Sequence, residues 1–203
     1  MLASLLISLA LASAMPAPVS RTDNGIAWES PIEVATGRGQ RGPWQQNDSR
    51  YDHVDDPAVA FTTDGELVVA WADQARKDVR LQRYGQDGAA RLPSPVDVSR
   101  SPDTFSWLPR VVAAPAQPRR IFVLWQEIIF SGGSHGGDIL FARSDDDGAS
   151  FGPPLNLSRS IGGDGKGRIT REHWDNGSLD LAAAGADVVH AAWTEYDGPL
   201  WHA

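Results

Sequence analysis

The sequence predicts an all-β fold, a β-propeller of which only about two and a half four-stranded blades are present. The first observation is a repeat, because an apolar run ending in Trp-x-(Asp/Glu) recurs at Trp71, Trp125 and Trp193. This spacing is close to the length of one blade, with extra loop in the second interval. The second observation is composition, since 20 Gly, 8 Trp and no Cys are typical of a β protein with many turns and no disulfides.

Each repeat contains short apolar and β-branched runs separated by Gly, Asp and Pro, the pattern of strands joined by turns. The strands expected in the first repeat are 57–61, 67–73, 78–84 and 96–99. Those of the second are 109–113, 121–127, 138–143 and 155–158. Those of the third are 179–183, 188–195 and 200–203. The sequence stops where a third strand should begin, so we expect it to be a fragment of a longer protein.

Residues 1–14 are predicted to be a signal peptide. The apolar run 2–12 is too short to cross a bilayer, and the small residues of 12–14 suit signal peptidase. No Lys or Arg precedes this run, which leaves a mis-assigned start or a buried strand as alternatives. Residues 15–50 are expected to lead into the propeller, which occupies 51–203. No later segment is apolar enough to span a membrane, so the expected localisation is secreted or periplasmic.

The segment 144–151 reads Ser-Asp-Asp-Asp-Gly-Ala-Ser-Phe. Ser144 and Asp146 are expected to hydrogen-bond to the turn backbone. Gly148 should take the positive φ of a tight hairpin, and Phe151 should fold back as an apolar plug. The pattern Ser-x-Asp-x-Gly-x-x-(Phe/Trp) resembles the Asp box, or neuraminidase repeat, of sialidases and related proteins. The resemblance implies a sialidase-like propeller of the six-bladed type, in which this motif is structural.

The resemblance also implies that a ligand site lies on the face opposite the Asp boxes. The first active-site Arg of the sialidases, which helps to clamp the substrate carboxylate, falls on Asp55 here, and an acid would repel that anion. Arg76 lies near the next Arg of the family, and Asp78 near its acid/base Asp. Glu195 and Tyr196 are catalytic candidates only because they adjoin in a loop of that face. The chain therefore lacks a complete catalytic site.

Three carboxylates, Asp73, Glu127 and Glu195, begin the loops of that face at equivalent places. One interpretation is a ring of acids that holds a cation or acts on a glycosidic bond. The favoured alternative is that the acid belongs to the repeat and accepts hydrogen bonds from the following turn. The repeated tryptophans are interpreted as core wedges between blades. His173 and Trp174 fall in another connection of the same face and are candidates for ligand contact, with ordinary packing as the alternative.

The charge balance, 18 Lys+Arg against 26 Asp+Glu, argues against a nucleic-acid partner. No metal-ligand spacing or cofactor motif is recognised, so no metal or cofactor is expected. The expected function is a secreted Asp-box propeller that binds a glycan or another cell-surface ligand without hydrolysing it. One alternative is a fragment of an exo-α-sialidase, a glycoside hydrolase that cleaves terminal sialic acids. The other is a structural or protein-interaction propeller.

Overall fold

The computed structural model describes residues 21–23, 25–28, 30–37, 53–101, 104–131, 134–158, 178–194 and 200–202. The predicted signal peptide, 1–14, and much of the predicted leading segment, 15–50, lie outside the described residues. The chain divides into two compact units, Met1–Glu33 and Val34–Ala203. In the first unit, β1 (Arg21–Asp23) and β2 (Ile26–Trp28) form an antiparallel hairpin.

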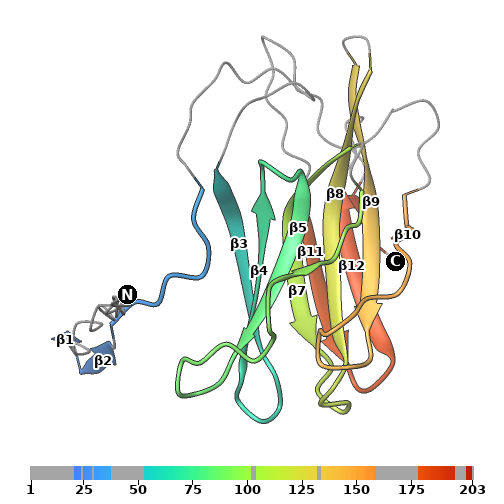
Figure 1. The fold of residues 1–203 in the computed structure, drawn as a ribbon. Coiled ribbons are helices and arrows are strands. Elements are labelled where there is room, and N and C mark those ends of the chain that lie inside the picture. The colour runs from blue at the N-terminus through green and yellow to red at the C-terminus, as the bar shows by residue number, and fades with distance from the viewer. Residues whose placement is uncertain are drawn as a thin grey trace, which may run out of the picture. The chain divides into compact units, whose positions relative to one another are not determined.

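The described part of the second unit consists of antiparallel sheets, in which each strand pairs with the next along the chain (Figure 1). The first sheet contains β3 (Val54–Phe61), β4 (Leu67–Asp73), β5 (Asp78–Tyr84) and β6 (Val96–Asp97). The second sheet contains β7 (Phe105–Ala113), β8 (Ile121–Ser131), β9 (Ser134–Ser144) and β10 (Leu155–Asn156). The third sheet contains β11 (Leu179–Ala184), β12 (Val188–Thr194) and β13 (Leu200–His202). The prediction of an all-β fold is confirmed.

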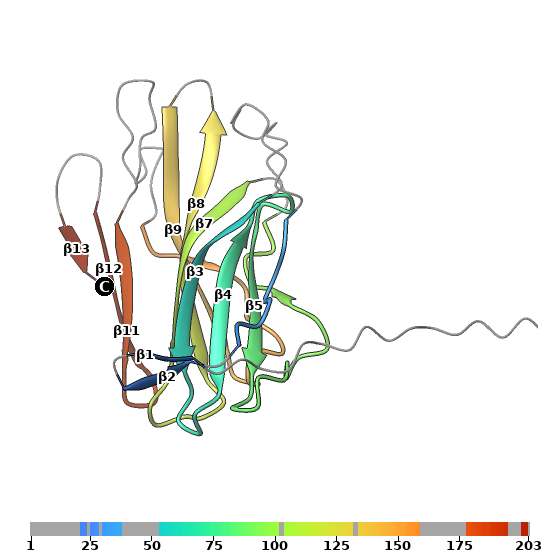
Figure 2. The same ribbon diagram turned by 90° about the vertical axis from the view of Figure 1, so that its left-hand side faces the viewer.

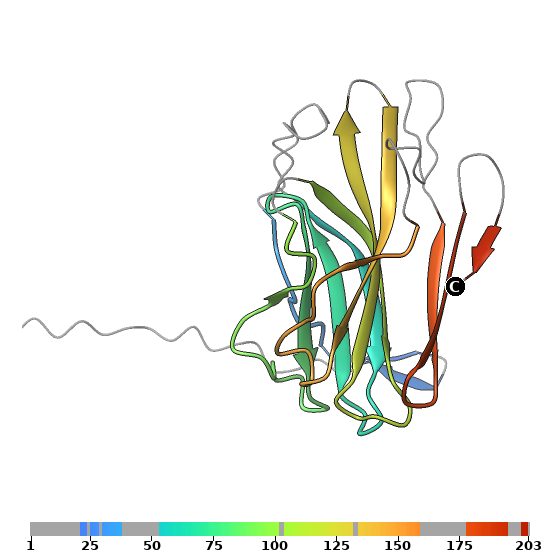
Figure 3. The ribbon, with the colours of Figure 1, turned by 90° about the vertical axis from the view of Figure 1, so that its right-hand side faces the viewer.

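The second sheet lies between the first and the third, as Figures 2 and 3 show from opposite sides. Successive residues of a strand point to opposite faces, so a sheet covered on both faces needs apolar residues at every position. The run 121–125 of β8 meets this need. Its odd-numbered residues Ile121, Val123 and Trp125 pack toward the first sheet, and its even-numbered residues Phe122 and Leu124 pack toward the third. A fully buried side chain of this kind contributes about 1.5–3 kcal/mol.

The three repeated tryptophans are core residues, each less than a tenth exposed. Trp125 is completely buried between the first and second sheets. Trp193 lies in the cluster between the second and third sheets. Trp71 belongs to a smaller cluster on the other face of the first sheet, where Val34 and Ala35 pack against it.

The first strand of each complete sheet begins earlier than the sequence predicts, at Val54 rather than residue 57 and at Phe105 rather than residue 109. In both strands a register shift occurs just before the predicted start, between Asp55 and Ala58 in β3 and between Trp107 and Arg110 in β7. A residue at positive φ followed by Pro lies in each bulge, at positions 56–57 and 108–109. Proline has no N–H to donate to the ladder, so it is placed in a bulge rather than at a strand end.

The hairpin of β8 and β9 is longer than predicted. Residues 128–137, between the predicted strands 121–127 and 138–143, are expected to form a connecting loop, but the ladder continues to the pair Ser131 and Ser134. The run Ile128-Ile129-Phe130 has high β propensity and faces the glycine-rich strand 134–137 in regular register. Gly136 and Gly137 are therefore part of the strand pairing and do not belong to the predicted loop.

Candidate functional site

The sheets have two distinct ends. The connections β3–β4, β5–β6, β7–β8 and β9–β10 lie at one end, which we call the turn end. The connections β4–β5 and β8–β9 lie at the other, which we call the loop end, because antiparallel neighbours alternate in direction. The segment 144–151 belongs to the turn end. The predicted acidic candidates Asp73, Asp78 and Glu127 belong to the loop end.

At the turn end, a network of short-range hydrogen bonds fixes the segment 144–151. The Ser144 hydroxyl donates to Asp146 Oδ1 at 2.8 Å and accepts the backbone N–H of Gly148 at 2.9 Å. Asp146 accepts both the backbone N–H and the hydroxyl of Ser150, at 2.9 and 2.6 Å. Gly148 has φ +79°, and Phe151 is buried in the core between the first and second sheets. Ser144, Asp146, Gly148 and Phe151 all serve to hold the turn, so these four residues of the motif have a structural role.

At the loop end, Glu127 is the most enclosed carboxylate, only 4% exposed. Its Oε2 accepts the Ser106 hydroxyl at 2.7 Å and the Trp125 indole N–H at 2.8 Å, and its Oε1 accepts the Thr104 hydroxyl. Burial raises the pKa of Glu127 to about 7, although the Ser106 and Trp125 hydrogen bonds lower it. Its donors come from its own strand and from β7 and the segment before it. The prediction that the repeated acid accepts hydrogen bonds from the turn that follows it does not describe these three donors, which all precede Glu127 in the sequence.

Asp73 follows the predicted pattern. Its Oδ1 accepts the backbone N–H of Arg76 at 3.1 Å, which closes the β4–β5 turn. Its Oδ2 pairs with the Arg76 guanidinium at 2.5 Å. The Arg76 side chain is 63% exposed, so this ion pair contributes little to stability. Arg76 is therefore an accessible cation at the loop end.

Asp78 is buried and has an acidic neighbour. It is 8% exposed, and β5 places it close to Asp97 of β6. Burial, followed by the negative charge of Asp97, raises the pKa of Asp78 to about 6. The Ser99 hydroxyl lies 3.4 Å from Oδ1 of each carboxylate and accepts the backbone N–H of Val79 at 3.1 Å.

The second sheet repeats this arrangement with one acid fewer. Asp138 pairs with Glu127 of β8, as Asp78 pairs with Asp73 of β4. The Ser158 hydroxyl donates to Asp138 at 3.0 Å and accepts the backbone N–H of Ile139 at 3.0 Å. Asn156 replaces the second acid and donates to Asp138 at 2.8 Å.

Asp55 and Asp56 form a second acidic pair at the loop end. The Gln74 side-chain amide donates to Asp55 Oδ2, and the backbone N–H of Gln74 donates to the carbonyl of His53 at 2.9 Å. Burial raises the pKa of Asp55, although the Gln74 hydrogen bond lowers it. Burial and the charge of Asp55 raise the pKa of Asp56 to about 6. Sequence reasoning singled out Asp55 but missed Gln74, because the two residues meet only through the pairing of β3 with β4.

A pocket of about 180 Å³ adjoins Asp55. Its lining residues are Val34, Ala35, Val54, Asp55, Pro57, Val69 and Trp71. Two polar atoms of the lining are buried without a hydrogen-bond partner among the described residues, namely Asp55 Oδ1 and Trp71 Nε1. One is an acceptor and the other a donor, and both belong to residues that line this otherwise largely apolar pocket.

The remaining candidates are not tested by the geometry. Glu195, Tyr196, His173 and Trp174 lie outside the described residues. Of the loop-end candidates that are described, Asp73 and Arg76 contact each other, and Asp78 interacts electrostatically with both Asp73 and Glu127.

Comparison with known proteins gives no match, since no family model fits the sequence and no curated protein matches it. Within the described ranges, no group of three or more His, Cys, Asp or Glu is arranged to hold a metal ion. The same ranges contain no helix of the length and apolarity needed to cross a membrane.

Proposed function

We propose that this chain is part of an exported, sialidase-like Asp-box β-propeller of the six-bladed type that binds a neutral glycan at its loop end without hydrolysing it. The propeller assignment is supported by sheets of sequential antiparallel strands that stack face to face, and by an Asp-box motif at the β9–β10 turn. The localisation rests on the signal-peptide pattern of residues 1–14.

The observation that carries the binding proposal is the pocket beside Asp55 and Trp71. A pyranose presents hydroxyl groups that both donate and accept, together with apolar C–H faces. Both atoms are covered from solvent, so a ligand reaches them only if the lining opens locally; Asp55 Oδ1 can then accept one sugar hydroxyl proton, and Trp71 Nε1 can donate to a sugar oxygen. The surrounding Val34, Val54 and Val69 side chains suit the apolar parts of the ring. The pocket holds one substituent of a sugar, such as a hydroxymethyl or acetamido group, and the rest of the glycan lies outside it.

The charge of this site favours a neutral ligand over sialate. Asp55 and Asp56 are adjacent acids, and the chain carries a formal charge of −8. A carboxylate ligand would be repelled by this pair, whereas hydroxyl groups can donate to it. Arg76 is already paired with Asp73, which reduces the positive charge available to clamp an anion.

The test is binding of purified protein to a panel of immobilised neutral and sialylated glycans, followed by titration calorimetry with the best ligand. Asp55→Asn keeps the size of the side chain but removes its charge, and Trp71→Phe removes the indole donor. Each is expected to weaken binding about fivefold or more, because one hydrogen bond is lost. The matched control is Asp87→Asn, which removes an acid of the turn end and should bind like the parent. Equal affinity in all variants, or a preference for sialylated glycans, would contradict the proposal.

Glycoside hydrolysis is a second candidate, favoured by the raised pKa values of Asp78 and Glu127. A carboxyl group that stays protonated near neutral pH can serve as a general acid. Both groups, however, are less than a tenth exposed, and a general acid must reach the glycosidic oxygen. Turnover of a fluorogenic sialoside that Arg76→Ala and Asp78→Asn abolish would establish the enzyme and refute the binding-only proposal.

A further inference from the structure

Three side-chain oxygens at the loop end of the first sheet are buried without a hydrogen-bond partner among the described residues. They are Asp55 Oδ1, Asp56 Oδ2 and Gln74 Oε1. The amide nitrogen of Gln74 is already used, because it donates to the other carboxylate oxygen of Asp55. Carboxylate and amide oxygens are acceptors, so none of the three can satisfy another. A buried polar atom without a partner lowers stability, so a positively charged ligand at these oxygens would stabilise the fold.

Strand pairing brings the three residues together. Asp55 pairs with Ala72 of β4, and the alternation of side chains puts Gln74 on the same face, where the two side chains form their hydrogen bond. Asp56 follows in the bulge of β3 with φ +48°, close enough to Asp55 for their charges to interact. Gln74 is only 5% exposed, and its contact with Asp55 holds its unpaired oxygen beside the acidic pair.

The second sheet has apolar residues at the equivalent places. Residues 54 apart correspond in the two sheets on β4 and β8, and residues 52 apart on β3 and β7, as the matching bulges and registers show. The counterparts of Asp55, Asp56 and Gln74 are therefore Trp107, Leu108 and Ile128. Oxygens that the repeat itself required would recur in both sheets. The three oxygens therefore belong to a feature of the first sheet alone.

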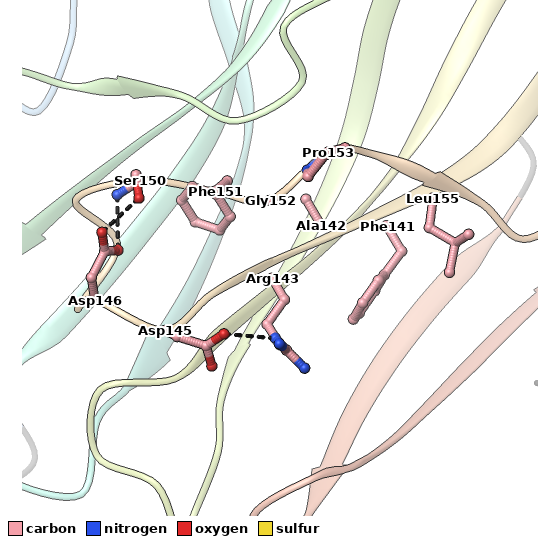
Figure 4. Close-up of a pocket in the computed structure, with 10 residues that line it drawn as sticks. All are labelled: Phe141, Ala142, Arg143, Asp145, Asp146, Ser150, Phe151, Gly152, Pro153 and Leu155. Atoms are coloured by element: carbon pink, nitrogen blue, oxygen red, sulfur yellow. Dashed lines mark hydrogen bonds and ion pairs between the residues drawn. The ribbon is translucent and has the colours of Figure 1, made fainter.

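Two acids of the turn end provide a contrast, because they are already paired. They line a pocket of about 530 Å³ (Figure 4). Asp145 pairs with Arg143 at 2.9 Å, and Asp146 accepts two hydrogen bonds from Ser150. At the loop end, Arg110 and His53 act on the acidic pair electrostatically, but neither supplies a hydrogen bond to Asp55 Oδ1 or Asp56 Oδ2.

We propose that Asp55, Asp56 and Gln74 form a binding site for a Ca²⁺ ion, with Asp55 Oδ1, Asp56 Oδ2 and Gln74 Oε1 as its side-chain ligands. Carboxylate and amide oxygens are the ligands that Ca²⁺ takes, and it accepts about six to eight oxygens in flexible geometry. Mg²⁺ demands near-ideal octahedral geometry and gives up its waters reluctantly, so this enclosed set suits it less. Water and main-chain carbonyls complete the shell. The site has two acids rather than three, because its third side-chain ligand is an amide.

The ion site goes beyond the proposed glycan binding and does not depend on it. Asp55 Oδ1 is also the atom offered to a sugar hydroxyl, and the two roles are compatible, because a Ca²⁺ ion with spare positions can take that hydroxyl as a further oxygen ligand. Two carboxylates balance the charge of the ion, so the site still offers no excess positive charge to sialate.

The test is calorimetric titration of the chelator-treated chain with Ca²⁺, without any glycan, at pH 8, well above the pKa of about 6 of Asp56. One Ca²⁺ is expected to bind per chain, more tightly than Mg²⁺. Asp55→Asn and Asp56→Asn should each weaken Ca²⁺ binding about tenfold or more, because each removes one of two ligand charges. Gln74→Leu should weaken it less, because it removes a neutral ligand. Asp145→Asn removes an exposed acid of the turn end and should bind Ca²⁺ like the parent.

Urea unfolding separates loss of the site from loss of the fold. A ligand that binds only the folded state stabilises it, so Ca²⁺ should raise the urea midpoint of the parent. Without Ca²⁺, Asp56→Asn should be at least as stable as the parent, because it relieves the repulsion from Asp55, and Ca²⁺ should leave its midpoint unchanged. Absence of Ca²⁺ binding by the parent would overturn the proposal. So would equal Ca²⁺ affinity in the parent and Asp56→Asn, or an affinity that only Asp145→Asn reduces, which would assign the ion to the turn end.

Discussion

Glu127→Gln is expected to stabilise the fold at pH 8 and to flatten the dependence of its stability on pH. Burial raises the pKa of Glu127 from 4.5 to about 7. Between these values the folded state holds the proton that the unfolded state has released, so the free energy of unfolding falls as the pH rises. The full shift corresponds to about 3 kcal/mol, at about 1.4 kcal/mol for each tenfold change. The amide of Gln stays neutral: with its oxygen in the place of Oε2 it can still accept from Ser106 and Trp125, and its nitrogen can donate to the hydroxyl oxygen of Thr104.

The assay is urea unfolding followed by tryptophan fluorescence at intervals from pH 5 to pH 8. The parent should lose stability across this range, and the Gln variant should lose markedly less. Asp56 and Asp78, whose pKa values burial also raises, leave a residual slope in the variant. Asp180→Asn, at an exposed position of β11, is the matched control and should retain the parent slope. Equal slopes in the parent and Glu127→Gln would refute the reasoning.

Three further predictions concern local features and are tested by urea unfolding. Gly148→Ala and Gly185→Ala both place Ala at positive φ, but only the Cβ at position 148 meets another side chain. Gly148→Ala should therefore lower the free energy of unfolding by about 1 kcal/mol or more beyond the loss in Gly185→Ala. Equal losses in the two variants would contradict the close approach of Gly148 to Leu81. Asp97→Asn should stabilise the fold at pH 7 by about 0.5–1 kcal/mol and have no effect at pH 3, because it relieves repulsion of the Asp78 carboxylate. Ser144→Ala should lower the free energy of unfolding by about 1–3 kcal/mol, because it leaves the buried N–H of Gly148 unpaired.

The features that sequence reasoning predicts well are local ones. The strand Leu67–Asp73 has the predicted bounds, because an apolar β-branched run between turn residues determines both its conformation and its length. The turn 144–151 lies within eight consecutive residues, and the hydrogen bonds that Ser144 and Asp146 make inside it join residues at most four apart. Long-range pairing was not needed to anticipate either feature.

The loop end could be predicted only in part, because its contacts join distant residues. Glu127 was a candidate from its place in the repeat, but its Ser106 donor is 21 residues away and is placed by the pairing of β7 with β8. Gln74 lies 19 residues from Asp55 in the sequence. The bulges that follow positions 55 and 107 depend on which neighbours the strands pair with. A single sequence gives residue types at these positions but not the register that brings them together.

The comparison of repeats also bears on which loop-end acids could act on a ligand. Asp78 and Asp138 occupy equivalent places, and each lies near a Ser hydroxyl that accepts the backbone N–H of the following residue. A contact made in the same way in two sheets belongs to the repeat, so we assign Asp78 a structural role. Asp55 differs, because Trp107 stands at its place beside the bulge of the second sheet. A residue that departs from the repeat is free to serve one site, and this is the physical reason to look for a ligand at Asp55 rather than at Asp78.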